Sequence, residues 1–554
     1  MQPILKPSED DDTTVIAPVS QSVITAKLPL LVLPRAMALR AQRYRHTALY
    51  SLWLRTRKSS KVAIFPLDPW AGSLTIGQKL VEGTLRVSNE EWSFSDNPWQ
   101  VPRETPLPVG VHRFAWLRDL HTLGGNQARA KARNLVVSWI KTHKDLNHPA
   151  WAADITAMRM VQWFSHYSFF GASSDRTVRL LLERALTVHL HILRHQYAAL
   201  PDDERRFVVL KGILYGYACL EDFRGGFVAS LPLLEELITT QIADDGSHKS
   251  NVPALHIRVL RDVLDIRALC HGQGIGVPLF LQQTIEKMVD VLRFIRLGNG
   301  MMPQFHGSGF ERRELLDTLL SIADSKAYIQ GRRQALGLQK MQAGITTVLL
   351  DTAATQHYAS LPLCESTLAF EMTVGKEKII TSCGVSPLLN ATWQQALQQS
   401  AAHSGLTLNN TGTGSSPNVT INRDALAPNA HLEVTHDGYA RRFGIVHTRK
   451  IMMTDNGEHI TGEDILEGQG HQEITLRFHL HPHIRAVYEQ GKNKVYLDLP
   501  SRDLWTFQAF SGTITLAESV YFCHSGARLD TKQIVVQGKT SEVKTVFKWV
   551  LQKA

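Results

Sequence analysis

The chain has 554 residues, which is too many for one compact hydrophobic core, so we expect two or three domains. Hydrophobic residues make up 44% of the composition and charged residues 20%, which excludes a disordered or fibrous protein. The formal net charge of +9 favours attraction to a polyanion, whether an acidic polysaccharide, a nucleic acid or a membrane surface. A basic surface that only aids solubility explains this charge equally well.

Residues 1–40 are predicted to form a flexible tail. They begin with an acidic, Pro- and Ser-rich stretch where a secretory signal would carry a basic start and an apolar run. The apolar stretch LPLLVLP at 28–34 is short and broken by prolines, so we predict no transmembrane segment. Five cysteines without a CxxC pair argue against a disulfide framework and a structural zinc site, and they are compatible with a reducing cytosol.

Residues 41–334 are predicted to form a helical domain. The early stretches FPLDPWAGSLTIG and EWSFSDNPWQVP are rich in Trp, Pro and Gly, which indicates loops whose aromatic side chains anchor the next domain. From about residue 111, apolar residues recur at spacings of three and four, as in the stretch that follows the capping candidates Ser174 and Asp175. Successive helices with short polar links favour a bundle or a closed ring of helical hairpins.

Residues 335–554 are predicted to form an antiparallel β-sandwich. Near residue 335 the pattern changes to short β-branched and aromatic runs, such as STLAFEMTVG and EITLRFHLHP, separated by turn residues. About a dozen such strands indicate a large sandwich. The Gly-, Ser-, Asn- and Pro-rich segment at 409–429 is expected to be a long loop.

The stretch DDGSHKSNVP holds more polar groups than a break between two helices needs. Gly246 permits a tight turn, and Pro253 is pre-organised for the first turn of a helix. His248 and Lys249 are not needed for that break. A loop that joins two helices of a ring places its side chains at one end of the ring, where a cleft would lie. We therefore take both as functional candidates, with a solvated loop histidine as the simpler alternative.

Three further places in the second half of the chain hold histidines beside other reactive side chains. They are QQSAAHSGLTLNN, HLEVTHDGYARRFGIVHTRK and RFHLHPHIR, and their candidate residues are His403, Asp437, Tyr439, Arg441 and His479. A lone histidine at a strand edge is more often structural. No HExxH motif occurs, so Asp437 and His479 could hold a metal ion only if the fold brings them together.

The order of a helical domain and a β-sandwich resembles the heparinase II/III family of bacterial polysaccharide lyases. The resemblance covers most of residues 65–550 and is carried by DDGSHKSNVP, PALHIRVLRDVLDIR, AAHSGLTL, HDGYARRFGIVHTRKI and LRFHLHP. It implies an incomplete (α/α) toroid joined to antiparallel sheets, with an acidic polysaccharide held in the cleft between them. It requires no cofactor and leaves room for a structural divalent metal.

The implied reaction is β-elimination on a uronic acid. The enzyme removes the C5 proton next to the carboxylate and expels the 4-linked oxygen, so the site must neutralise the carboxylate, supply a base and protonate the leaving oxygen. By resemblance, His403 would be the base or the partner of the carboxylate, His248 would line the same cleft, and Tyr439 would be the available phenol. The substrate-binding candidates are Lys211, Lys249, His256 and Arg441.

The chain departs from the family pattern at two places, which indicates a divergent branch. Leu255 and His256 stand where the family often has a tyrosine near the new helix. The helix RRFVVLKGILYG lacks the Asn-His pair of many members, and Lys211 could supply the missing positive charge or simply lie on the helix surface.

Two other functions remain open. One is a non-catalytic protein that binds or handles an acidic envelope glycan, with Lys249, Arg441 and Arg442 as contacts. The other is a glycoside hydrolase, for which Asp244 and Asp245 are the paired acids near the expected cleft. Nucleic-acid binding is disfavoured because the basic residues form no dense stripe. The resemblance implies the cell envelope, whereas the N-terminus is compatible with the cytoplasm.

Overall fold

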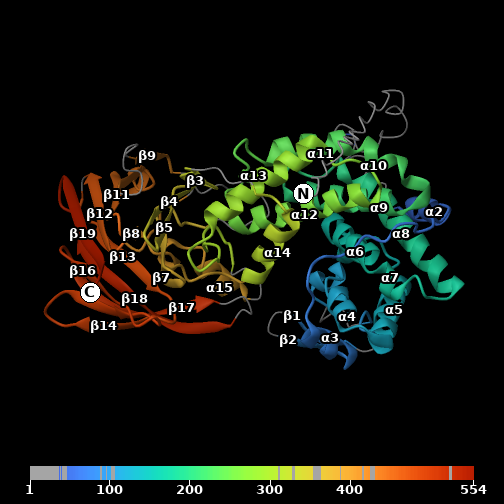
Figure 1. The fold of residues 1–554 in the computed structure, drawn as a ribbon, viewed down its shortest axis with the longest axis horizontal. Coiled ribbons are helices and arrows are strands. Elements are labelled where there is room, and N and C mark those ends of the chain that lie inside the picture. Colours follow the sequence, from blue (N-terminus) through green and yellow to red (C-terminus); the bar gives the residue numbers. More distant parts are fainter. Residues whose placement is uncertain are drawn as a thin grey trace, which may run out of the picture.

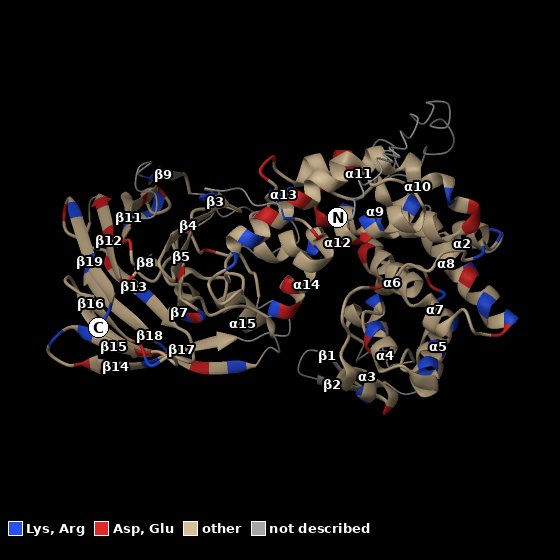
Figure 2. Cartoon of the chain, viewed as in Figure 1, with Lys and Arg blue, Asp and Glu red and all other residues tan. Residues whose placement is uncertain are grey.

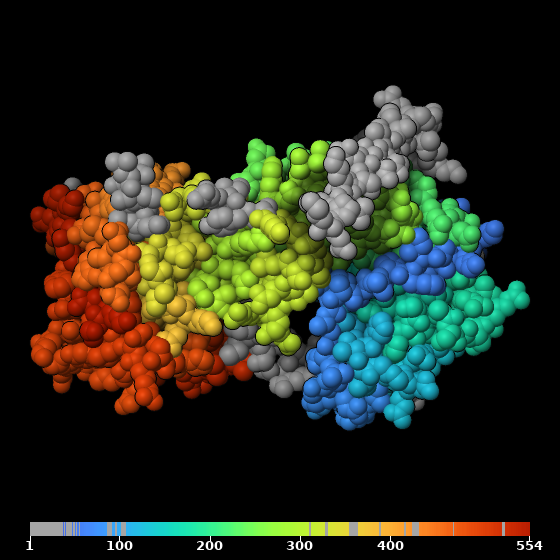
Figure 3. Space-filling view, in the orientation of Figure 1, coloured from blue at the N-terminus to red at the C-terminus, as the bar shows by residue number. Residues whose placement is uncertain are grey.

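The computed structural model describes residues 37, 39 and 47–554, apart from 88–89, 95–96, 101–106, 310–311, 327–330, 354–363, 387–388, 415–416, 424–430, 469 and 523–526. The described part has two lobes, one of helices and one of sheets (Figures 1 and 3). Most of the expected tail, residues 1–40, therefore lies outside the described residues. Among the residues that are described, no helix combines the length and hydropathy that a bilayer crossing requires.

The first lobe is a helical toroid. Its helices are α2 (Ala48–Arg55), α3 (Leu74–Val81), α4 (Leu117–Leu123), α5 (Gly125–Thr142), α6 (Ala153–Ser165), α7 (Tyr167–Phe170), α8 (Arg176–Tyr197), α9 (Glu204–Cys219), α10 (Gly225–Ala229), α11 (Leu231–Gln241), α12 (Pro253–Gly272), α13 (Leu279–Ile295) and α14 (Arg313–Ala323). A small hairpin of β1 (Thr84–Val87) and β2 (Glu90–Ser93) precedes α4. Asp175 begins α8 as predicted, because its carboxylate accepts the Val178 N–H at 2.9 Å.

Helix α9 forms the centre of the helical lobe because it is apolar on nearly all sides, and its residues from Phe207 to Cys219 are buried. Gly212 and Gly216 lie one turn apart on it. A Cβ at Gly212 would stand 2.8 Å from the Ala157 Cβ, and a Cβ at Gly216 would stand 2.4 Å from the Met160 Cε. The two glycines therefore let α6 pack closely against α9.

The second lobe is an antiparallel β-sandwich. One sheet has eight strands in the order β14-β15-β16-β19-β12-β11-β10-β9, and the other has nine, in the order β17-β18-β13-β7-β6-β5-β4-β3 with β8 paired to β13. The bounds are β3 (Gln334–Ala335), β4 (Leu338–Ala343), β5 (Thr346–Asp351), β6 (Phe370–Val374), β7 (Glu377–Thr381), β8 (Leu406–Leu408), β9 (Val419–Arg423), β10 (His431–His436), β11 (Ile445–Met453), β12 (His459–Gly468), β13 (Glu473–Leu480), β14 (Arg485–Glu489), β15 (Lys494–Asp498), β16 (Leu504–Ala509), β17 (Thr513–Phe522), β18 (Arg528–Lys539) and β19 (Lys544–Lys553).

The core between the two sheets holds aromatic rings and one buried ionic cluster. Trp549 stacks on Phe370 with ring centroids 5.6 Å apart. The Asp464 carboxylate, which is fully buried, accepts hydrogen bonds from His447 at 2.8 Å, Arg449 at 2.7 Å and the Trp549 indole at 3.0 Å. These contacts tie β11, β12 and β19 together beneath the other sheet.

The predicted architecture, a helical toroid followed by an antiparallel sandwich, is confirmed. The change from helices to strands falls between the end of α14 at Ala323 and the start of β3 at Gln334. Two short helices, α15 (Ala391–Ala396) and α16 (Ala440–Phe443), interrupt the sheets.

Candidate functional site

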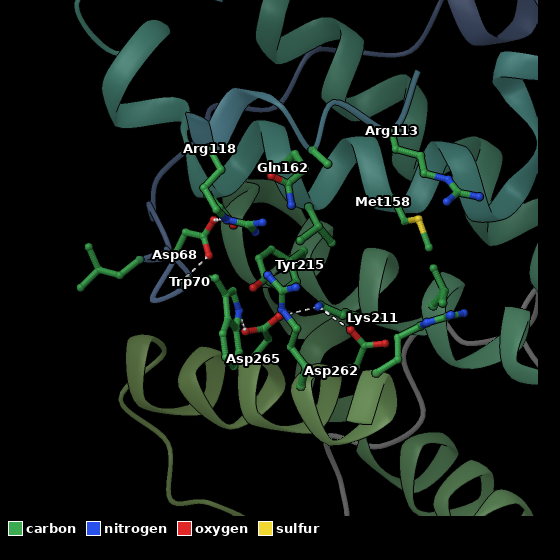
Figure 4. Close-up of a pocket in the computed structure, with 17 residues that line it drawn as sticks. Asp68, Trp70, Arg113, Arg118, Met158, Gln162, Lys211, Tyr215, Asp262 and Asp265 are labelled. Carbon is green, nitrogen blue, oxygen red and sulfur yellow. Dashed lines mark hydrogen bonds and ion pairs between the residues drawn. The ribbon is translucent and has the colours of Figure 1, made fainter. Parts of the chain in front are cut away.

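A cleft of about 260 Å³ opens among the helices of the toroid (Figure 4). Helices α4, α6, α9 and α12 contribute to its lining, as does the loop before α3. Among the described residues, every residue of the lining comes from the toroid, which differs from the expected cleft between the two domains. The residues that line it are Leu67, Asp68, Trp70, Arg113, Ala115, Arg118, Met158, Val161, Gln162, Ser165, Val208, Lys211, Tyr215, Arg258, Arg261, Asp262 and Asp265.

Helix α12 presents two arginines to the cleft, Arg258 and Arg261, at a spacing of three residues that places them on one face. Among the described residues neither guanidinium has a hydrogen bond or an ion pair. Arg261 stacks over the Trp70 ring at 4.4 Å from its centroid. Burial, followed by the neighbouring charge of Arg118, lowers the pKa of Arg261. Both side chains therefore offer donors to an anion that enters the cleft.

Lys211 links the two acids of α12. Its ammonium lies 2.7 Å from Asp262 and 2.5 Å from Asp265, between the two carboxylates (Figure 4). Burial acts to lower the pKa of Lys211, but the two carboxylates outweigh it and the net pKa is raised. Asp265 also accepts the Trp70 indole N–H at 2.9 Å, which fixes the ring that supports Arg261. Lys211 thus lines the cleft as predicted for a substrate-binding residue, although its charge is already neutralised.

A second ionic group lies on the opposite wall. Asp68 pairs with Arg118 at 2.6 Å and with His166 at 3.2 Å, and the His166 ring contacts His121 at 3.0 Å between Nδ1 atoms. Burial acts to raise the pKa of Asp68, but the hydrogen bond to His166 and the charge of Arg118 outweigh it and lower the pKa. Arg118 is therefore held in place at the rim.

The charges of the cleft favour an anionic ligand with polar hydroxyl groups. Five cationic side chains face three carboxylates in its lining, so the cleft has a positive balance if each carries its usual charge. Trp70 and Tyr215 add aromatic surface beside them, of the kind on which sugar rings can pack. Because two of the arginines have no internal partner among the described residues, a carboxylate or sulfate could bind there without breaking an ion pair.

His248 is buried away from this cleft. It is 0% exposed, and its Nδ1 accepts the Ser250 backbone N–H at 3.1 Å. Burial, with the charges of His256 and Arg258 as smaller causes, lowers its pKa to about 3. The expected turn is present, since Gly246 has a φ of 87° and a Cβ there would meet the Lys287 backbone at 2.5 Å. The loop packs against the sandwich through Ser247, whose hydroxyl accepts the Leu336 N–H at 3.0 Å.

His403 lies inside the sandwich at the domain junction. It is 4% exposed, its Nδ1 is 3.1 Å from the Ser382 hydroxyl, and burial lowers its pKa to about 3. The charges that act on it come from His479 and His306, whereas those acting on His248 come from His256 and Arg258. The structure therefore does not bring His248 and His403 to one open cleft, because packing encloses each ring separately.

Tyr439 is also enclosed. Its hydroxyl donates to the Leu406 carbonyl at 2.6 Å, its ring is 1% exposed, and burial raises the pKa of its phenol. A phenol held in this way is not free to protonate a leaving oxygen. Arg441 is exposed and, together with Asp437 and Tyr439, lines a cavity of about 1030 Å³ in the sandwich that is distinct from the toroid cleft.

The structure does not bring the predicted metal ligands Asp437 and His479 together, and they line different cavities. Asp437 accepts two hydrogen bonds from Asn418, at 2.8 and 2.6 Å. His479 uses its Nδ1 toward Ser519 at 2.8 Å and its Nε2 toward the Ala401 carbonyl at 2.9 Å. With these contacts in place, neither side chain is available to the other through a shared ion.

The remaining predicted contacts also lie away from the cleft. His256 is buried and its Nε2 donates to the Met288 carbonyl at 3.0 Å, which ties α12 to α13. Lys249 is exposed and its ammonium donates to the Thr239 carbonyl at 2.9 Å. Asp244 and Asp245 do not line the cleft either, because Asp245 holds Ser247 and Arg332 instead.

Comparisons with known proteins identify the second domain of this chain. Residues 332–550 match the family model described as Heparinase II/III-like, C-terminal. The chain therefore carries a heparinase II/III-like C-terminal domain. It is 25% identical over 527 residues to a protein named FtsZ-localized protein C from Caulobacter vibrioides, covering 88% of this chain and 90% of the relative.

Solved structures share the whole fold of this chain. A crystal structure of heparinase III matches with a TM-score of 0.67 at 14% identity, covering 97% of this chain and 94% of that one. Heparan sulfate lyase HepC from Pedobacter heparinus matches with a TM-score of 0.61 at 15% identity, covering 94% and 90%. At these identities the likeness establishes the fold, and the chemistry has to be argued from the residues of this chain.

One cluster of histidines in the described part of this chain has the spacing of a metal site. Ring nitrogens of His112, His143 and His148 lie within 4.8 Å of one another. The hydrogen bonds argue against an ion, because the His112 Nδ1 accepts the Trp139 indole N–H and the His148 Nδ1 accepts the Ala150 N–H, both at 3.1 Å. Each neutral ring must then carry its proton on Nε2, so neither offers that nitrogen to a metal.

Most of the residues that line the cleft were not predicted from the sequence. Arg258, Arg261, Asp262 and Asp265 recur at spacings of three and four along α12, whose other residues are largely buried. A polar stripe on an otherwise buried helix was the signal that could have shown this face. Trp70 gave no such signal, because it lies in a loop and a tryptophan there is usually a packing anchor.

Proposed function

We propose that this protein binds an acidic saccharide in the cleft of its toroid and does not cleave it by β-elimination. The observation that carries the proposal is the pair Arg258 and Arg261, two guanidiniums without an internal hydrogen bond or ion pair among the described residues, placed beside Trp70 in a cleft of about 260 Å³. Guanidinium groups recognise carboxylate and sulfate through paired hydrogen bonds.

The distribution of charge supports an anionic ligand in the helical domain. Residues 41–334 hold 37 Lys and Arg against 28 Asp and Glu, whereas residues 1–40 and 335–554 are each balanced. The entire formal excess of nine positive charges therefore lies in the domain that contains the cleft (Figure 2). A field of this sign would raise the local concentration of a polyanion.

The alternative function is cleavage of a uronic-acid-containing polysaccharide by β-elimination. That reaction needs a base that reaches the C5 proton and an acid that reaches the leaving oxygen. His248, His403 and Tyr439 are the residues proposed for these roles, and each is at most 4% exposed. A substrate could reach their reactive atoms only after the packing around each residue opened, so binding without elimination needs fewer changes.

The relatives support both halves of this proposal. The matched structures are named as heparinase III and heparan sulfate lyase, which are enzymes of acidic polysaccharides. The curated relative carries a name that describes where it localises rather than a reaction. A divergent chain that binds an acidic saccharide on the same scaffold, but does not catalyse the reaction, is compatible with the names of both kinds of protein.

The test is calorimetric binding of heparan sulfate and uronic-acid oligosaccharides to the purified protein, with the same mixtures followed in the ultraviolet. We expect binding without the absorbance of a new C4–C5 double bond. Replacing both Arg258 and Arg261 by alanine should weaken binding at least about tenfold, because each charged hydrogen bond contributes about 1.5–3 kcal/mol.

Arg179→Ala, at an exposed arginine of α8 outside the cleft, is the matched control and should leave the affinity unchanged. Growth of ultraviolet absorbance with the wild-type protein would establish the lyase alternative in place of this proposal. Failure of every acidic oligosaccharide to bind, or equal binding by the double variant, would overturn the assignment of the cleft.

A further inference from the structure

A hydroxyl, an imidazole and a main-chain carbonyl form a hydrogen-bonded series in the sandwich, far from the arginines of the toroid cleft. The Ser519 Oγ lies 2.8 Å from the His479 Nδ1, and the His479 Nε2 lies 2.9 Å from the Ala401 carbonyl oxygen. Ser519 comes from β17, His479 from β13 and Ala401 from the turn before β8. Three separate segments therefore converge on one imidazole.

The hydrogen bonds fix the protonation of this ring. A carbonyl oxygen can only accept, so the His479 Nε2 must carry the proton that it donates to Ala401. The Nδ1 of the neutral ring then has a free lone pair, and it faces the Ser519 hydroxyl as acceptor. Burial lowers the pKa of His479 to about 4, so the ring is neutral at pH 7 and its Nδ1 lone pair is not blocked by a proton. This is the arrangement of a nucleophile, a base and a group that orients the base.

The series opens on a cavity of about 540 Å³ that is lined by both Ser519 and His479. β17 is the edge strand of its sheet, so one side of this segment has no neighbouring strand. Its lining combines small and apolar residues, Ala401, Ala402 and Leu397, with the charged residues Glu518, Arg528 and Asp530. A small acyl group and a polar alcohol would therefore each find side chains of matching polarity in this cavity.

We propose that Ser519 and His479 form a second, catalytic site that hydrolyses small carboxylic esters of polar alcohols. The Ser519 Oγ forms a bond to the acyl carbon while its proton moves to the His479 Nδ1. The carbon–oxygen bond to the alcohol then breaks, and the alcohol leaves with that proton.

Water completes the cycle. It attacks the acyl carbon and gives a proton to the His479 Nδ1, the bond from the acyl carbon to Oγ breaks, and Ser519 recovers the proton. Ester and water become alcohol and carboxylic acid, so the balance needs no oxidant, reductant or further group. The site is independent of the saccharide cleft, and either can exist without the other.

Cys383 is the competing nucleophile in this cavity. Its sulfur lies 3.5 Å from the same His479 Nδ1 and 3.9 Å from the Ser519 Oγ. Burial raises the pKa of its thiol to about 11, so it stays protonated at neutral pH. The serine is nearer to the base, and we therefore assign the attacking atom to Ser519.

The test combines turnover with covalent labelling of the full chain. Hydrolysis of p-nitrophenyl acetate is followed by absorbance, and a fluorophosphonate probe is mapped to a residue by peptide mass spectrometry. We expect the probe on Ser519, and Ser519→Ala should abolish labelling and lower the rate at least about 100-fold, since a positioned base contributes about 10²–10⁴ to a rate.

Two variants separate the serine from its neighbours. In Cys383→Ala the probe should still label Ser519, and Ser541→Ala, at an exposed serine outside the cavity, is the matched control and should change neither labelling nor turnover. Absence of labelling in the wild-type protein, a label on another residue, or equal turnover by Ser519→Ala would each overturn the proposal. Loss of labelling in Cys383→Ala with thiol modification of the wild type would reassign the nucleophile and overturn it as stated.

Discussion

The polar side chains of the toroid cleft and those of the domain junction differ in how deeply they are buried. In the cleft, Arg258 is exposed and Arg261 is partly buried against Trp70, and neither has a hydrogen bond or ion pair among the described residues. At the junction, His248 and His403 are almost fully buried, and packing lowers the pKa of each to about 3. The difference shows that the arginines of the cleft keep at least part of their surface accessible, whereas the two imidazoles predicted for elimination are part of the packing.

The same contrast appears in the charges. The helical domain carries the whole positive excess, whereas the charges of the sandwich are balanced. Asp464 shows how a fully buried charge of the sandwich is compensated, because its carboxylate is surrounded by Arg449, His447 and Trp549. On our proposal, charge serves binding in one lobe and structure in the other, and the following experiments test that division.

The largest effect should be the loss of unfolding free energy when the buried Asp464 carboxylate of the sandwich is removed. Asp464→Ala leaves the Arg449 guanidinium uncompensated at a position with no exposure, so we expect a loss of about 3–5 kcal/mol of unfolding free energy. Urea denaturation followed by circular dichroism measures it. Glu467→Ala, which breaks an exposed pair with Lys544 at 2.9 Å, is the control and should cost less than about 1 kcal/mol. Equal effects of the two variants would contradict a structural role for the buried cluster.

Stability should fall with acid because of the buried histidines. The pKa of His403 is about 3 in the fold, below its usual value of 6.5, so the unfolded chain takes up a proton first as the pH drops. The stability from this group is therefore complete above pH 6.5 and is lost toward pH 3, at about 1.4 kcal/mol per pH unit.

Urea unfolding of the wild type and of His403→Asn between pH 6 and pH 4.5 measures this contribution. The variant should show a slope smaller by about one proton, and His271→Asn, at an exposed side chain, is the control and should leave the slope as it is. An unchanged slope in His403→Asn would mean that this ring is reached by solvent, which would restore it as a candidate base.

A smaller effect is expected from raising the salt concentration, which should weaken binding of an acidic oligosaccharide in the cleft. Raising the ionic strength shortens the range of the attraction between the helical domain and an acidic oligosaccharide. We expect the dissociation constant to increase about tenfold between roughly 0.05 and 0.5 M salt. Calorimetric titrations at several salt concentrations measure this, and a salt-independent affinity would place the ligand outside the positive lobe.

The smallest effect on the affinity should come from replacing Arg441 of the sandwich. Arg441→Ala removes an exposed charge that lines a different cavity, so the affinity for an acidic oligosaccharide should change by less than about twofold. The same titration measures it. A large loss would show that the sandwich, and not the toroid, carries the anion-binding surface.

The architecture could be predicted from the sequence because it rests on periodicity. Apolar spacings of three and four gave the helices, and alternation in short runs gave the strands, with the change between Ala323 and Gln334. The cap at Asp175 and the turn at Gly246 were likewise local features that the chain specifies by itself. Such signals depend only on residues that are close together in the sequence, so they can be recognised without knowing the tertiary contacts.

The site could be predicted only in part because burial depends on distant segments. Lys211 lines a cleft, but its carboxylate partners on α12 lie more than fifty residues away in the sequence, so its ion pairs could not be predicted. Nothing near His403 in the sequence shows that Ser382 and the junction enclose it. The motifs that carried the family resemblance are therefore as compatible with packing around the two imidazoles as with chemistry.

The most direct measurement is a crystal structure of the protein soaked with an acidic disaccharide. Our account predicts an intact sugar in the toroid cleft, with its carboxylate or sulfate against Arg258 and Arg261 and a ring beside Trp70. An unsaturated, cleaved product lying between the two lobes against His403 would contradict it.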